Sequence, residues 1–166
     1  MKIIALGMLT MLGGCVMAVG NTTTNAPPVA IERETITYET TPCFGTCPVY
    51  SVTIQPDGSG VFDGKRFTAV TGTRTFRATP AQYRAFAAKL QPYRPEQGEK
   101  IVQPGSPDCG NAPSDAPSVD IRWTEISGGS QRLSYYYGCR TADGTMADTL
   151  RAAPTDLPIA AFIGKH

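Results

Sequence analysis

The sequence predicts an α+β domain in which an antiparallel β-sheet, folded as a meander, carries one main helix and a C-terminal helix on one face. Three observations lead to this prediction. Apolar and polar residues alternate in several short segments, turn sequences rich in glycine and proline separate these segments, and one further segment has apolar residues at helical spacing. Along the chain the predicted elements follow the order βββ(β)-α-ββ-α.

A β-meander is predicted for the first part of the domain. Alternation places Tyr50, Val52 and Ile54 on one face of a strand. Pro56-Asp57-Gly58 is a typical turn, and Asp63-Gly64 is typical of a hairpin. Turn positions also explain both aspartates without catalysis. The predicted strands are 34–40, 49–55, 60–63 and 67–77, the last broken near Gly72.

The main helix is predicted to begin after Thr79, which serves as the N-cap, with Pro80 at the first helical position. The helix is expected to end by Pro92. Its apolar face consists of residues at positions i, i+3, i+4 and i+7, namely Tyr83, Phe86, Ala87 and Leu90.

The second part of the domain is predicted to add two strands and a helix. The preceding segment, 91–117, is long for a loop without structure, so we expect Cys109 to tie it down. Alternation places Tyr135 and Tyr137 in the core and leaves Tyr136 exposed as a candidate ligand contact. The predicted elements are strands 118–126 and 131–137, a helix over 143–152 and an apolar packing segment over 157–163.

The amino terminus resembles that of a bacterial lipoprotein. Residues 1–14 form a predicted signal peptide, with Lys2 before an apolar stretch, and Leu12-Gly13-Gly14-Cys15 resembles a lipobox. Cys15 is therefore the predicted lipidation site and the contact with membrane lipid. Residues 15–31 form a predicted flexible tether, and 32–166 a single α+β domain.

This resemblance implies a location in the bacterial cell envelope. Val16 follows the cysteine, where lipoproteins retained in the inner membrane tend to carry aspartate. We therefore expect a lipid-anchored protein on the outer membrane, facing the periplasm.

Composition excludes several functional classes. Removal of Lys2 with the signal peptide leaves 14 basic and 14 acidic residues, so the mature chain has no net charge to attract nucleic acid. The only histidine is His166, the last residue, where packing cannot orient a catalytic or zinc-binding imidazole. We expect no enzyme activity, no cofactor and no metal site.

Cys43, Cys47, Cys109 and Cys139 remain after lipidation, and an even number in an oxidising compartment predicts disulfides. Three connectivities are possible, and we favour Cys43–Cys47 with Cys109–Cys139. A redox pair at Cys43 and Cys47 is an alternative, but it would have three intervening residues and a strand after it. A four-cysteine metal site would need two closely spaced pairs.

The segment Pro42-Cys43-Phe44-Gly45-Thr46-Cys47-Pro48-Val49-Tyr50 resembles the Cys-Phe-Gly-x-Cys-Pro-x-Tyr motif of a bacterial domain of unknown function, DUF6438, found in small envelope lipoproteins. Gly64-Lys65-Arg66-Phe67 and Tyr137-Gly138-Cys139 extend the resemblance, which runs over about 35–164. The resemblance implies no established activity.

Three functions are compatible with these patterns. The first is a non-enzymatic binding or structural module whose partner is an envelope protein or polymer. The second is a periplasmic enzyme inhibitor that presents the loop Phe44-Gly45-Thr46, because a loop closed by a short disulfide loses little entropy on binding. The third is a thiol redox protein that uses Cys43 and Cys47.

Overall fold

The computed structural model describes residues 34–110 and 112–165. The predicted signal peptide (1–14), the predicted anchor Cys15 and the predicted tether (15–31) lie outside these residues, as does His166. Within the described part of the chain, no helix is both long enough and apolar enough to cross a membrane.

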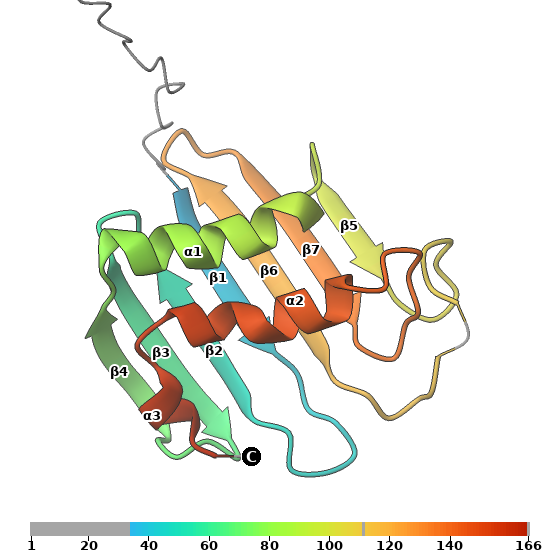
Figure 1. Cartoon of the computed structure of the whole chain (residues 1–166), viewed down its shortest axis with the longest axis horizontal. Coiled ribbons are helices and arrows are strands. Elements are labelled where there is room, and N and C mark those ends of the chain that lie inside the picture. The colour runs from blue at the N-terminus through green and yellow to red at the C-terminus, as the bar shows by residue number, and fades with distance from the viewer. Residues whose placement is uncertain (1–33, 111, 166) are drawn as a thin grey trace, which may run out of the picture.

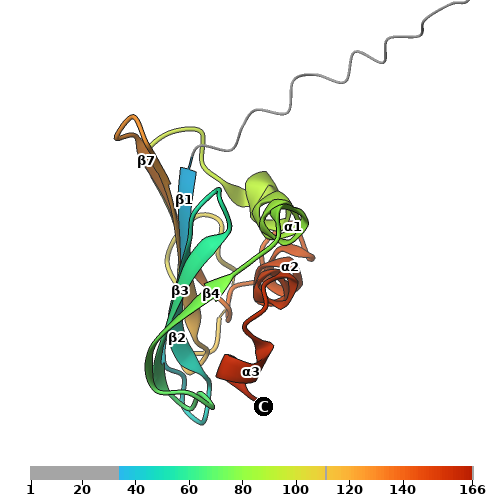
Figure 2. The same cartoon turned by 90° about the vertical axis from the view of Figure 1, so that its left-hand side faces the viewer.

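The domain is a seven-stranded sheet with strand order β4-β3-β2-β1-β6-β7-β5 (Figure 1). All neighbouring strands are antiparallel except β5 and β7. The helices lie on one face of the sheet (Figure 2), which confirms the predicted α+β class. The strands are β1 (Glu34–Thr40), β2 (Val49–Ile54), β3 (Ser59–Arg66), β4 (Gly72–Arg77), β5 (Glu99–Val102), β6 (Ser118–Glu125) and β7 (Ser130–Tyr136). The helices are α1 (Pro80–Leu90), α2 (Met146–Ala152) and α3 (Ala160–Ile163), with 3-10 turns η1 (Gln91–Tyr93) and η2 (Ala153–Asp156).

The hydrophobic core lies between the sheet and the helices, because alternate residues of each strand point to opposite faces. The largest fully buried side chains are Trp123, Tyr38, Tyr83, Tyr135, Phe62, Phe86, Ile36, Ile54, Leu90, Ile121, Leu133 and Leu150. Trp123 and Tyr135 were both predicted to be core residues, and Tyr137, predicted with them, is half-buried.

On the other face of the sheet, two neighbouring carboxylates are paired with cations. Glu39 and Asp120 are direct neighbours on β1 and β6, an unfavourable arrangement for two carboxylates. Each carboxylate has its own cation: Lys65 Nζ donates to Glu39 at 2.5 Å, and Arg132 donates to Asp120. The hydrogen bond to Asp120 raises the pKa of Arg132.

Helix α1 begins and packs as predicted. The Thr79 hydroxyl accepts from the Gln82 backbone N–H at 3.2 Å, and the Gln82 side chain accepts from the Thr79 N–H at 2.9 Å, which completes a capping box. The buried residues of the helix are the predicted apolar face: Tyr83, Phe86, Ala87 and Leu90.

The prediction of a hairpin turn at Asp63-Gly64 is wrong. Both residues lie within β3, opposite Thr73 and Gly72 of β4, and the chain reverses over 67–71 instead. A Cβ atom at Gly64 would lie 1.9 Å from the carbonyl oxygen of Val70. Glycine is therefore required here for a close backbone approach and not for a turn, and sequence alone does not distinguish these two uses.

Segment 91–117, predicted to be a loop, contains strand β5. Strand β5 pairs in parallel with β7, and only Val102 among its residues is buried. A short edge strand has little burial alternation, and its partner begins about 30 residues later in the chain, so local patterns give no signal.

Helix α2 begins at Met146, later than the predicted Asp143. The carboxylate of Asp143 accepts hydrogen bonds from the hydroxyl and N–H of Thr145, at 2.7 and 2.9 Å. These bonds form a turn before the helix and lower the pKa of Asp143.

The predicted apolar segment 157–163 packs on the meander. Leu157 and Ile159 are buried, and the ring of Phe162 lies 5.5 Å from that of Phe62 on β3. Backbone N–H groups of Ala69 and Val70 donate to carbonyl oxygens at the end of α3, which fixes the β3–β4 hairpin against that helix.

Arg94 fixes the start of β1 at the upper end of the sheet in Figure 1. Its guanidinium donates to Glu34 at 2.6 Å and to the Gln131 side-chain oxygen at 2.7 Å, and lies 3.5 Å from Glu125. It also lies 5.7 Å from the centre of the Trp123 ring, a cation–π distance. One side chain thus connects β1, β6 and β7.

Candidate functional site

The loop between β1 and β2 is closed by a disulfide. Cys43 and Cys47 are bonded, with their Cα atoms 5.8 Å apart, as predicted. Between them the N–H of Gly45 donates to the Cys43 carbonyl oxygen at 3.0 Å. Gly45 has φ 153°, a conformation that residues with a side chain rarely adopt, so glycine lets the loop reverse within the disulfide ring.

The base of this loop is held by two threonines. The Thr40 hydroxyl donates to the Pro48 carbonyl oxygen at 2.8 Å and accepts from the Tyr50 N–H at 3.0 Å. The Thr41 hydroxyl accepts from the Ser118 N–H at 2.7 Å. The loop is therefore fixed to both strands that flank β1.

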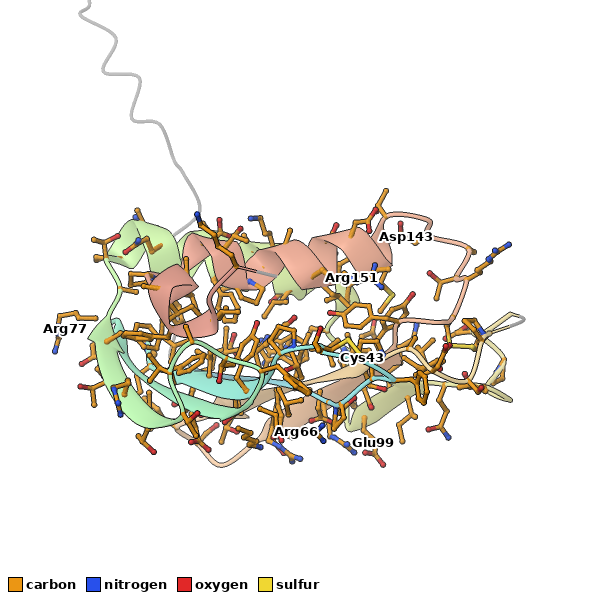
Figure 3. All side chains as sticks on the ribbon, turned by 90° about the horizontal axis from the view of Figure 1, so that it is seen from below. Cys43, Arg66, Arg77, Glu99, Asp143 and Arg151 are labelled. Atoms are coloured by element: carbon orange, nitrogen blue, oxygen red, sulfur yellow. A yellow bond between two sulfur atoms is a disulfide. The ribbon has the colours of Figure 1, made fainter. Side chains whose placement is uncertain are left out.

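Phe44 lies at the tip of the loop and is 91% exposed, more than any other large hydrophobic side chain described. Gly45 and Thr46 beside it are also exposed. The backbone of Phe44 is ordered, because its N–H donates to the Asp115 carbonyl oxygen at 3.2 Å. Figure 3 looks onto this end of the sheet, with Cys43 labelled. The structure thus presents an aromatic ring to solvent from a rigid loop.

A second loop, 112–117, lies beside Phe44. A hollow of about 350 Å³ separates the two loops, lined by Pro42, Cys43, Phe44, Ser114, Asp115 and Ala116. No local sequence pattern relates segments so far apart in the chain, so the sequence does not predict this neighbour.

Tyr136 supports the second loop. Its hydroxyl donates to the Pro113 carbonyl oxygen at 2.5 Å and accepts from the Ala116 N–H at 3.0 Å. The side chain is half-buried, where the sequence indicated exposure. A Cβ atom at Gly138 would lie 2.5 Å from the Tyr136 ring, so the glycine of Tyr137-Gly138-Cys139 provides space for it.

Tyr50 of the first motif and Tyr137 of Tyr137-Gly138-Cys139 both contact Tyr38. The ring centres of Tyr50 and Tyr38 are 6.3 Å apart, and the hydroxyl oxygens of Tyr38 and Tyr137 are 3.3 Å apart. The guanidinium of Arg151 lies 4.3 Å from the centre of the Tyr137 ring. Burial raises the pKa of all three tyrosines, that of Tyr137 to about 12. These phenols are therefore protonated at neutral pH and do not act as bases there.

Cys109 and Cys139 form the second disulfide, with Cα atoms 4.8 Å apart, which confirms the favoured connectivity. This bond ties segment 91–117 to the end of β7, as expected. Beside it lies an open cleft of about 700 Å³ between η1, β5 and the loop before α2, with buried Val102 and Met146 in its lining. Two charged residues at the edge of this cleft form a salt bridge with each other: Lys100 Nζ lies 3.1 Å from Asp108 Oδ2.

All four cysteines of the described chain are thus used in disulfides, and none is a free nucleophile or metal ligand. Strand β2, rather than a helix, follows Cys47. Over residues 34–110 and 112–165, no three His, Cys, Asp or Glu side chains are grouped to hold a metal ion.

Comparison with known proteins identifies the family and nothing closer. No curated protein and no solved structure matches the chain. The family model described as Domain of unknown function (DUF6438) matches residues 34–157, a range that begins with β1 and ends after η2. That range includes both disulfides, the loop with Phe44 and the tyrosine cluster. The chain therefore belongs to the DUF6438 family of domains of unknown function.

Proposed function

We propose that this protein is a non-catalytic binding module of the bacterial cell envelope, anchored through acylated Cys15, that contacts an envelope protein or polymer through loop 42–47. The exposed ring of Phe44 on this rigid loop is the observation that carries the proposal. Aromatic side chains supply much of the energy at protein interfaces. A loop already ordered by a disulfide and by backbone hydrogen bonds loses little further entropy on binding.

The position of the loop supports a partner away from the anchoring membrane. Glu34 begins β1 and the loop follows its last residue, so the two lie at opposite ends of the sheet (Figure 1). A strand of this length spans about 23 Å. A chain anchored through Cys15 enters the domain at Glu34, and a flexible tether adds roughly 20–25 Å. Phe44 would then face the aqueous compartment.

Site-specific crosslinking in the living host tests the proposal. A photoreactive amino acid replaces Phe44 in the full chain, and in a matched control it replaces Ile126, an 81% exposed residue at the β6–β7 hairpin. We expect a discrete adduct from position 44 and none from position 126. In a separate affinity pulldown without crosslinking, the Phe44→Ala chain should recover at least tenfold less of that partner than the wild-type chain. Equal labelling from both positions would contradict a specific contact at the loop.

Anchoring has a separate test. Mass spectrometry of the mature protein is expected to find acylated Cys15 as its first residue. An unprocessed chain with Met1 still present would remove the basis for an envelope location.

Enzyme inhibition is a second candidate, favoured by the same protruding loop, whose disulfide preserves its shape inside a partner's cleft. It predicts that the crosslinked partner is an enzyme and that the full chain, but not Phe44→Ala, lowers its rate. A redox function for Cys43 and Cys47 is tested by the reduction potential of their bond. A structural disulfide is expected below about −300 mV, whereas a value near about −200 mV would favour thiol exchange.

A further inference from the structure

Strand β4 forms an open edge of the sheet, because β3 is its only neighbour among the described residues. Beyond the end of the strand, the Ala78 N–H donates to the Gly58 carbonyl oxygen at 2.8 Å. Backbone groups of an antiparallel edge strand alternate between its neighbour and the outside. This alternation directs the N–H and C=O groups of Thr73, Thr75 and Arg77 away from β3.

Neither a bulge nor a proline blocks the backbone of β4, and the charged residues on this edge are Arg74 and Arg77. Its pairing with β3 is continuous from Gly72 to Arg77, without a bulge, and the strand contains no proline. In Figure 2, where β4 faces the viewer, no described element covers its outer side. Four of its six residues are exposed, and Gly72 and Phe76 are half-buried.

The charge of this edge is positive. Arg74 Nη1 donates to the Thr73 carbonyl oxygen at 2.7 Å, and Arg77 Nη1 donates to the Asp57 main-chain oxygen at 3.2 Å. Neither guanidinium forms a salt bridge with any carboxylate in the described ranges. Because strand side chains alternate, Arg74 and Arg77 lie on opposite faces of the sheet, so acidic groups on either face of an incoming strand can pair with one guanidinium.

We propose that β4 binds an extended acidic segment of a partner protein as an additional strand of the sheet. Backbone hydrogen bonds to Thr73, Thr75 and Arg77 would supply affinity, and the arginines would select acidic side chains. An open hollow of about 510 Å³ lies next to this edge, over β2, β3 and β4, and Thr53, Val61 and Thr75 are in its lining.

The positive charge of β4 favours an acidic partner segment over a second copy of this chain or residues 16–31 of the same chain. A second copy of the chain, paired through its own β4, would bring four arginine side chains to one seam. Residues 16–31 of this chain carry no charged side chain, so they offer nothing to the guanidinium groups. This edge is separate from loop 42–47, and the inference does not depend on the function proposed for that loop.

Peptide binding to the full chain in detergent tests the inference. The probe is a fluorescent eight-residue peptide of alternating glutamate and valine, and its control alternates lysine and valine. We expect saturable anisotropy with the acidic peptide only, together with slower hydrogen exchange at the Thr73 and Thr75 amides. Binding should weaken as salt is added.

Two variants locate the site. Thr75→Pro removes an outward N–H without breaking the ladder to β3, and Arg74→Glu combined with Arg77→Glu reverses the charge. Each should weaken binding at least tenfold while the circular dichroism spectrum is unchanged. Arg122→Glu is the control on another strand: Arg122 is exposed on β6, has no salt bridge within residues 34–110 and 112–165, and its replacement should leave binding unchanged.

Three results would overturn the inference. These are the absence of acidic-peptide binding at millimolar concentration, equal binding of the basic peptide, and hydrogen-exchange protection elsewhere than on β4. If Thr75→Pro does not fold, the variant with both arginines replaced by glutamate tests the site. Undiminished binding of the acidic peptide to that variant would also contradict binding at β4.

Discussion

Replacing Arg94 with methionine should destabilise the domain more than any other single change to an ion pair. The Arg94 and Glu34 side chains are only 16% and 13% exposed, so water cannot replace the lost contact well. Glu34 and Glu125 are direct neighbours on β1 and β6, and without the guanidinium two carboxylates would face each other.

The expected loss of stability can be estimated from these contacts. Breaking a buried ion pair costs about 3–5 kcal/mol, because one charge stays buried and unpaired. Glu125 is 44% exposed, so solvent relieves part of the repulsion, and we expect a loss of about 2–3 kcal/mol. For a domain of this size, this corresponds to a decrease in Tm on the order of 10 °C.

Urea denaturation of Arg94→Met and of the wild-type chain measures this loss. Trp123 is the only tryptophan and reports unfolding by fluorescence, with circular dichroism as a second probe because Arg94 contacts that ring. Adding Glu34→Gln to Arg94→Met should restore part of the stability, since it removes the unpaired charge.

Lys65→Met is the matched control. It breaks an exposed pair whose side chains are 40% and 43% accessible, and should cost less than about 0.5 kcal/mol. A loss for Arg94→Met no larger than that for Lys65→Met would contradict a buried ion pair at Arg94, and so would a further loss when Glu34→Gln is added to Arg94→Met.

Two other predictions concern the disulfides and alkaline pH. Replacing Cys109 and Cys139 with serine should lower the free energy of unfolding by about 3.7 kcal/mol, and replacing Cys43 and Cys47 should lower it by about 2 kcal/mol. The first loss is larger because that disulfide closes a longer loop. Urea titrations that reverse this order would contradict the loop-entropy explanation. Burial raises the pKa of Tyr137 from 10.0 to about 12, so folding favours its protonated form, and this contribution is complete below pH 10 and is lost as the pH rises toward 12. Wild-type stability should therefore fall more steeply above pH 10 than that of Tyr137→Phe, and parallel pH curves from urea titrations would refute this assignment.

Where local patterns carry the information, the sequence predicted the structure. Helix α1 follows from the cap at Thr79 and from apolar spacing, both of which act within a few turns of the chain. The Cys43–Cys47 bond follows from proximity in sequence. Gly64 shows the limit, because its requirement arises from the Val70 carbonyl oxygen in the loop between β3 and β4, which the Asp63-Gly64 pattern does not reveal.

The candidate site divides in the same way. The sequence identified the loop that carries Phe44, because its motif is contiguous. It did not identify the loop with Asp115 beside it, or the hydroxyl of Tyr136 that supports this second loop. Those contacts depend on how β1, β6 and β7 align, and long-range pairing is set by the packing of the whole sheet.

Short-range periodicity and turn chemistry encode the α+β class, strands β1 and β2, the main helix and the residues of the disulfide-closed loop, so the amino-acid sequence alone predicts them. Three features appear only in the folded domain: β5 joins the sheet, Tyr38, Tyr50 and Tyr137 meet, and β4 is an open edge among the described residues. The physical reason is that these features arise between segments far apart in the chain. Their contact free energy exists only once the sheet and helices have closed around one core.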